Sequence, residues 1–130
     1  MFSKVTNKIR VTAIPLYVPE QSFPDDSLFS WIYNIIVENQ GENPAQLISR
    51  YWKITDGYGD VTTVRGKGVV GEQPVIKPGT YYEYTSSCQL KTNSGIMEGT
   101  YYFQTLDGEQ FEVEIPVFSL DIPYNIYTLN

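Results

Sequence analysis

The chain has 130 residues, 42% of them hydrophobic, and a formal net charge of −6. This length suits a single domain over residues 1–130, the apolar content excludes a wholly disordered chain, and the acidic balance disfavours general nucleic-acid binding. Aromatic residues make up 15% of the chain and are mostly tyrosine. Flat rings pack well on a pleated sheet, so this composition favours an all-β domain.

The charges are unevenly distributed along the chain. Four basic residues lie in its middle, and no basic residue follows Lys91. We interpret the acidic C-terminal third as solvated strand faces rather than as a docking surface. The four basic residues are Arg50, Lys53, Arg65 and Lys67.

The expected compartment follows from cysteine usage and from the N-terminus. Cys88 is the single cysteine, which excludes an internal disulfide and fits a reducing compartment. The first residues lack the apolar segment and the cleavage site of a signal peptide, and the apolar runs are too short to span a bilayer. We therefore expect a soluble, cytoplasmic protein with no membrane span.

The first half of the chain alternates with strand periodicity. Residues 7–19 predict a strand, and Pro15 and Pro19 predict that it lies at a sheet edge or carries a bulge. Residues 28–39 predict the clearest strand, with one apolar face formed by Phe29, Trp31, Tyr33, Ile35 and Val37.

The next predicted strands surround a glycine-rich stretch. Residues 45–55 predict a strand, with Ile48, Trp52 and Ile54 on or near one face. A short β-branched strand is expected over residues 61–65. The face opposite Trp52 is expected to carry Leu47, Ser49, Tyr51 and Lys53.

The second half predicts an aromatic strand and a hairpin. Tyr81, Tyr82 and Tyr84 cannot share one strand face, so at least one of them is expected to be exposed. Asp107 and Gly108 predict a hairpin turn, and Tyr101 is a candidate for a hydroxyl-to-backbone tyrosine corner. With no helical periodicity, the chain predicts an antiparallel β-sandwich of roughly seven to nine strands.

Gly66, Gly68 and Gly71 spell G-x-G-x-x-G, the fingerprint of dinucleotide-binding turns. That site needs a helix directly after the turn, and Pro74 opens a run that cannot continue as a helix. A weaker hypothesis remains, in which backbone N–H groups converge on an anion. Its predicted ligand-binding residues are Arg65, Gly66, Lys67, Gly68, Gly71 and Arg50. The simpler interpretation, which we favour, is that Gly66 and Gly68 supply positive φ angles or a bulge between strands.

Catalytic and metal chemistry find little support in the residue types. The chain has no histidine, which excludes Ser–His and Cys–His catalysis. Cys88 lies in a predicted strand and is expected to be a small buried hydrophobe. One cysteine without histidine disfavours a transition-metal site. We expect no catalytic residue, no metal site, no cofactor and no enzymatic activity.

Three stretches, residues 17–22, 39–60 and 64–86, resemble the ApaG family, and the resemblance continues through "GIMEGTYYF" and "IPVFSL". It implies an immunoglobulin-like, fibronectin type III-like sandwich. It also implies a binding domain that in bacteria is associated with cobalt resistance and magnesium efflux. The same domain occurs in a eukaryotic F-box protein and a polymerase-delta-interacting protein, which suggests protein–protein recognition. The family's glycine motif has been proposed as a pyrophosphate-binding element.

One position departs from the family pattern. Tyr51 stands where family members commonly have histidine, so any metal or proton role of that histidine is absent here. Together these observations predict a non-enzymatic protein-recognition domain, monomeric or homodimeric, with an unidentified protein partner and an indirect link to cobalt and magnesium. The alternative is a sensor of a phosphate-containing small molecule, pyrophosphate or a nucleotide, that uses residues 65–71.

Overall fold

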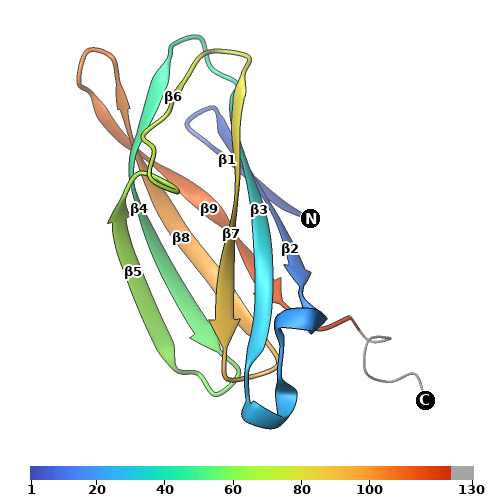
Figure 1. Cartoon of the computed structure of the whole chain (residues 1–130). Coiled ribbons are helices and arrows are strands. Elements are labelled where there is room, and N and C mark those ends of the chain that lie inside the picture. The colour runs from blue at the N-terminus through green and yellow to red at the C-terminus, as the bar shows by residue number, and fades with distance from the viewer. Residues whose placement is uncertain (124–130) are drawn as a thin grey trace.

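Two antiparallel sheets packed face to face form the structure, a computed structural model that describes residues 1–123 (Figure 1). The first sheet has the order β1-β2-β3-β7, and the second has the order β5-β4-β8-β9, with β6 paired to the start of β4. The nine strands of the described residues confirm the predicted all-β sandwich. Their bounds are β1 (Phe2–Thr6), β2 (Ile9–Tyr17), β3 (Phe29–Asn39), β4 (Ala45–Asp56), β5 (Val61–Lys67), β6 (Val75–Ile76), β7 (Tyr81–Leu90), β8 (Gly95–Thr105) and β9 (Gln110–Leu120).

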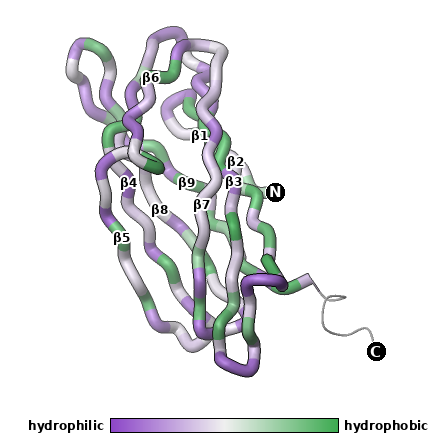
Figure 2. The backbone as a smooth tube through the Cα atoms, in the orientation of Figure 1, coloured by the Kyte–Doolittle hydropathy of each residue, from purple (hydrophilic) through white to green (hydrophobic). Residues whose placement is uncertain are grey.

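Helical structure in the described residues is confined to two short 3-10 turns, η1 (Pro19–Gln21) and η2 (Pro24–Asp26). No helix of residues 1–123 has the length and apolar character needed to cross a membrane. Figure 2 shows hydrophobic and hydrophilic residues in short alternation along the strands rather than in long blocks. Such alternation lets each strand bury one face and expose the other.

The strand β3 buries the predicted face. Trp31, Tyr33, Ile35 and Val37 are all buried, and Phe29 is partly buried. On the facing sheet, the Trp52 ring contacts the Tyr33 ring edge-on, with 5.5 Å between their centroids. This aromatic contact lies in the space between the two sheets.

The predicted faces of β4 are partly wrong. The pairing of β4 with β8 shifts register between Leu47 and Ser49, so Ile48 forms a bulge. Leu47 is fully buried, whereas Ile48 is only partly buried. An extra residue in one strand reverses the alternation that follows it. Leu47 and Trp52 therefore both face the core, although their spacing places them on opposite faces of a regular strand.

The prediction that β2 is an edge or bulged strand is also partly wrong. Most of β2 is an inner strand, because it pairs with β1 on one side and with β3 on the other. However, β1 pairs only as far as Ala13, so Pro15 lies beyond the end of β1. At this point β2 is locally an edge, where a residue without an N–H group is tolerated.

Tyr101 does not form the predicted corner to the backbone. Its hydroxyl lies against the hydroxyl of Tyr84 in a short hydrogen bond between the sheets. Tyr101 is fully buried and Tyr84 nearly so, while Tyr81 is 63% exposed. The inward tyrosines thus find their polar partners in each other, and the expectation that one of the three β7 tyrosines is exposed is confirmed.

Candidate functional site

The glycine-rich stretch forms a tight turn and not the start of a helix. Val69 and Glu72 exchange two backbone hydrogen bonds, of 2.8 and 2.9 Å. Between them, Val70 and Gly71 have φ angles of 43° and 82°. Two consecutive positive φ angles are the signature of a two-residue hairpin turn. Gly71 therefore supplies the second positive φ angle of this turn.

The other two glycines direct their backbone toward β4. The N–H of Gly68 donates to the carbonyl of Ile48 at 2.7 Å, and at the far end of the same ladder the N–H of Asp56 donates to the carbonyl of Asp60. Hydrogen-bonded pairs recur at every second residue of an antiparallel ladder. Gly66, which pairs with Arg50, therefore also turns its N–H toward β4 and away from solvent.

A positive φ of 65° and close packing against backbone explain why residue 68 is glycine, whereas a side chain at residue 66 would displace the end of the Arg50 side chain. A Cβ atom on Gly66 would lie 2.7 Å from Nη1 of Arg50, and one on Gly68 would lie 2.1 Å from the carbonyl oxygen of Glu72. The Arg50 Nη1 donates to the carbonyls of Lys67 and Gly68, at 3.3 and 2.9 Å. Arg50 thus lies over Gly66 and holds the end of β5.

Basic residues are concentrated in β4 and β5. The Arg65 guanidinium stacks 4.3 Å above the centre of the Tyr51 ring. Tyr51 is the residue that stands where members of the ApaG family commonly have histidine. Tyr51 of β4 pairs with Arg65 of β5, so both side chains lie on the outer face of the sheet. Lys53 and Lys67, each two residues further along its strand, lie on the same face. Four of the nine basic residues of the chain are in these two strands, and β5 contains no acid.

The predicted anion-binding residues come together only in part. Arg50, Gly66, Lys67 and Gly68 are neighbours at the end of β5. The side chain of Arg50 lies on the inner face of the sheet, whereas Arg65 and Lys67 point outward from it. The two cationic faces are thus separated by the sheet itself, and phosphate binding by this stretch stays a prediction.

The outer edge of β5 is open. Because the even-numbered residues of β5 bond to β4, the backbone groups of Val61, Thr63 and Arg65 face away from the sheet. Among residues 1–123, no donor or acceptor reaches these groups. All three residues are exposed. Alternation along the chain predicts the strand, but the open edge follows only from the strand order.

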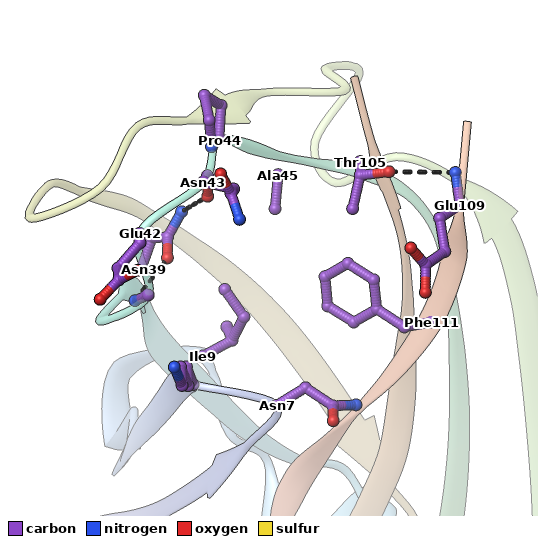
Figure 3. Close-up of a pocket in the computed structure, with 12 residues that line it drawn as sticks. Asn7, Ile9, Asn39, Glu42, Asn43, Pro44, Ala45, Thr105, Glu109 and Phe111 are labelled. Carbon is purple, nitrogen blue, oxygen red and sulfur yellow. Dashed lines mark hydrogen bonds between the residues drawn. The ribbon is translucent and has the colours of Figure 1, made fainter. Parts of the chain in front are cut away.

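A hollow of about 280 Å³ opens at one end of the sandwich, where three turns meet (Figure 3). Ile9, Ala45 and Phe111 line its apolar part, and sequence reasoning did not identify it. The amide nitrogen of Asn39 donates there to two carbonyls, those of Asn43 and Ile76. The amide is therefore used to fix the turn, and no predicted site residue lies here.

The acids around the turn after β4 are engaged in local contacts. Asp56 Oδ1 accepts the N–H groups of Tyr58 and Asp60, at 2.9 and 3.0 Å. The Lys91 ammonium lies 2.6 Å from Asp60 Oδ2, a hydrogen bond that raises the pKa of Lys91. Within residues 1–123, no three His, Cys, Asp or Glu residues are arranged to hold a metal ion.

Cys88 is buried in β7, as its sequence position predicts. Burial raises the pKa of its thiol from 9.0 to about 11. A thiol at this pKa stays protonated at neutral pH and is a weak nucleophile. No histidine is available to activate it.

Known proteins are similar to this chain in both sequence and fold. The ApaG domain matches residues 19–105. The protein ApaG of Brucella suis biovar 1 (strain 1330) is 51% identical, and that of Methylocella silvestris is 48% identical, each over the full length of both chains. The crystal structure of the putative ApaA protein from Bordetella pertussis superposes with a TM-score of 0.88 at 47% identity, covering 89% of this chain and 94% of that one. The chain therefore belongs to the ApaG family.

Proposed function

We propose that this chain is a non-enzymatic protein-recognition domain and that it binds its partner through the surface of β4 and β5. The observation that carries this proposal is the combination of an unpaired edge strand with a concentration of cations on an otherwise acidic protein. The partner surface would be acidic, and the net charge of −6 disfavours nucleic acid as the partner.

Contacts among the side chains of this surface support a recognition role. Tyr51 holds the guanidinium of Arg65, and Arg50 ties down the end of β5 through two backbone carbonyls. Side chains that are already ordered lose less conformational entropy when a partner binds. Val61, 52% exposed on the same outer face as Arg65 and Lys67, adds apolar area beside the charges.

Several features support a non-enzymatic role. The chain has no histidine base, and the raised pKa of the Cys88 thiol opposes nucleophilic chemistry. An association with cobalt and magnesium transport would then act through the partner protein. This indirect link is part of the proposal.

Site-specific photo-crosslinking tests the proposal. A photoreactive amino acid at Val64 should trap the same protein repeatedly, and the double variant Arg65→Glu/Lys67→Glu should lose that product. The matched control position is Leu106, which is 70% exposed in the β8–β9 turn. Crosslinks that are equal at both positions, or that survive the charge reversal, would contradict recognition by β4 and β5.

A second candidate function is the binding of a small phosphate-containing anion. Its support is the proximity of Lys67, Gly68 and the Arg50 guanidinium at the end of β5. An NMR amide titration with pyrophosphate, ATP and diadenosine tetraphosphate tests it, at low and at physiological salt. Saturable shifts confined to Arg50 and residues 65–71, and persisting at physiological salt, are expected if the anion binds. No shift at millimolar ligand would refute it.

A further inference from the structure

We propose that the open edge of β5 binds an extended, acidic segment of the partner protein as an added antiparallel strand. This inference rests on the proposed recognition function and specifies the chemistry and the backbone geometry of the partner. It would lengthen the second sheet from β5-β4-β8-β9 by one strand beyond β5.

The backbone of β5 is free to accept such a strand. Val61, Thr63 and Arg65 direct both their N–H and their C=O groups outward. Val61–Lys67 contains no proline and no inward-pointing charge, which are two of the features that block strand addition. Its edge cations, Arg65 and Lys67, oppose a basic strand but attract an acidic one. An added strand would satisfy these groups through main-chain hydrogen bonds.

The opposite edge of the same sheet shows what a protected edge looks like. On β9, the outward N–H of Glu114 donates to Thr6 Oγ1 at 3.3 Å, and the outward carbonyl of Glu112 accepts from Asn7 Nδ2 at 3.0 Å. Lys4 adds an ion pair with Glu114. No comparable contact covers the outward groups of β5 between Val61 and Arg65 in the described part of the chain.

The side chains of β5 define the residues that an added strand would need. Arg65 and Lys67 lie two residues apart on the outer face, and directly opposed residues of paired strands have Cβ atoms about 5 Å apart. Acidic residues at alternate positions of the partner would oppose these two cations. The intervening partner residues would lie beside Val64, which is 38% exposed, and would be apolar. The expected segment therefore alternates acidic and apolar residues.

Charge also distinguishes β5 from the other open edge. On β7, Glu83 is exposed, and the nearby Tyr82 hydroxyl donates to Glu72 at 2.9 Å. Acids near an edge repel an acidic segment, and at physiological salt such repulsion acts over about 8 Å. A second copy of this chain is a poorer occupant of the β5 edge, because it would bring Arg65 and Lys67 of both chains to one interface.

A peptide binding experiment with amide exchange tests this inference. The probes are an acetylated and amidated TVEVEVT peptide, its lysine counterpart TVKVKVT, and the acidic peptide with alternate amides N-methylated. NMR of labelled protein should show saturable binding of the acidic peptide, with exchange of the Thr63 and Arg65 amides slowed about tenfold or more. The lysine and N-methylated peptides should bind about tenfold more weakly or not at all.

Variants separate strand pairing from simple charge attraction. Thr63→Pro removes an outward N–H without touching the bonds to β4, so the fold should persist while acidic-peptide binding is lost. Arg65→Glu/Lys67→Glu should also abolish binding. The matched control, Lys8→Glu/Lys77→Glu, changes the net charge equally at exposed sites away from β5 and should bind normally. If Thr63→Pro does not fold, the charge-reversal pair still tests the proposal.

Three results would overturn the inference. They are acidic-peptide binding without slowed exchange at Thr63, equal binding of the lysine peptide, and protection of the same amides by self-association alone at high protein concentration. A Val64 crosslink to a partner that persists while the acidic peptide fails to bind would refute strand pairing but leave protein recognition in place. Failure of both would refute the proposed function.

Discussion

Along one side of the sandwich, β9 lies against β1, and side chains of β1 and its turn occupy the outward backbone groups of β9. Along the other side, β5 and β7 do not pair with each other, and β5 keeps a row of outward backbone groups (Figure 1). Both sides face the same physical problem, because every edge strand presents unpaired polar groups. On the β9 side, residues of the same chain bond to these polar groups, whereas on the β5 side the groups are left to solvent or to a binding partner.

The difference shows how stability and recognition are divided in this domain. The closed side carries buried aromatic residues, including Phe118, which is 1% exposed and contacts Tyr33 and Trp52. The open side carries exposed residues of β5, anchored from behind by Arg50. We therefore expect substitutions on the closed side to affect folding and those on the open side to affect binding.

The largest expected effect is on the closed side. Phe118→Ala should lower the free energy of unfolding by about 3–5 kcal/mol, because a large buried ring is replaced by a cavity. On the open side, Val64→Ala should cost less than about 1 kcal/mol, because Val64 is already 38% exposed. Urea unfolding measures both. Equal losses for the two variants would show that the two sides do not differ in burial.

A smaller effect is expected within the glycine turn. Gly68→Ala should cost about 3 kcal/mol, because its positive φ is combined with a Cβ placed 2.1 Å from a backbone oxygen. Gly71 has a positive φ but open space around it. Gly71→Ala should therefore cost only about 1–2 kcal/mol, which makes it the matched control. Thermal or urea unfolding that ranks Gly71→Ala as the more damaging change would contradict the packing argument.

Stability at alkaline pH tests whether the β7 side chains that face the core, Cys88 among them, are shielded from solvent on the open side. The pKa of the Cys88 thiol is raised from 9.0 to about 11, so the folded state favours the protonated thiol. This contribution is complete below pH 9.0 and is lost as the pH rises toward about 11. Burial also raises the pKa of Tyr33 from 10.0, which adds a loss at higher pH.

The free energy of unfolding, measured as a function of pH, should thus fall above pH 9.0. In Cys88→Ala this free energy should fall less steeply between pH 9.0 and about 11. Rapid reaction of native Cys88 with a thiol reagent at pH 8, at the rate of an unfolded control, would indicate instead that solvent reaches this residue from the open side.

The smallest expected effect concerns the closed edge. Thr6→Val keeps the shape of the side chain but removes the hydroxyl that accepts from the N–H of Glu114. Exchange of the Glu114 amide should accelerate by about threefold to tenfold, the factor for one ordinary hydrogen bond. The Arg65 amide, which already faces solvent, serves as the internal control. An unchanged Glu114 amide would show that Thr6 does not protect this edge.

Much of the fold could be predicted from local patterns. Alternation in residues 28–39 correctly placed Trp31 and Tyr33 in the core, and Asp107 and Gly108 marked a hairpin turn that the structure contains. Local steric rules act on neighbouring residues, so they can be read from neighbouring letters. The same rules excluded a helix after the glycine motif.

Other features depended on contacts between distant segments. The bulge at Ile48 is a property of the pairing between β4 and β8, and no alternation within β4 reveals it. The hydroxyl of Tyr101 found Tyr84 on the other sheet in place of a backbone carbonyl. For the candidate site, the sequence identified the basic residues and the glycines. It did not predict on which face of the sheet each of them lies.

What the sequence by itself determined is therefore the strand content, the inward faces of most strands, the absence of histidine chemistry and the family resemblance. Only the tertiary structure decided which strands lie at the edges, that Arg50 faces inward over Gly66 while Arg65 faces outward on Tyr51, and that β9 is covered while β5 is not. The physical reason is that side-chain direction follows from adjacent residues, whereas strand order and edge exposure depend on hydrogen bonds between segments far apart in the chain.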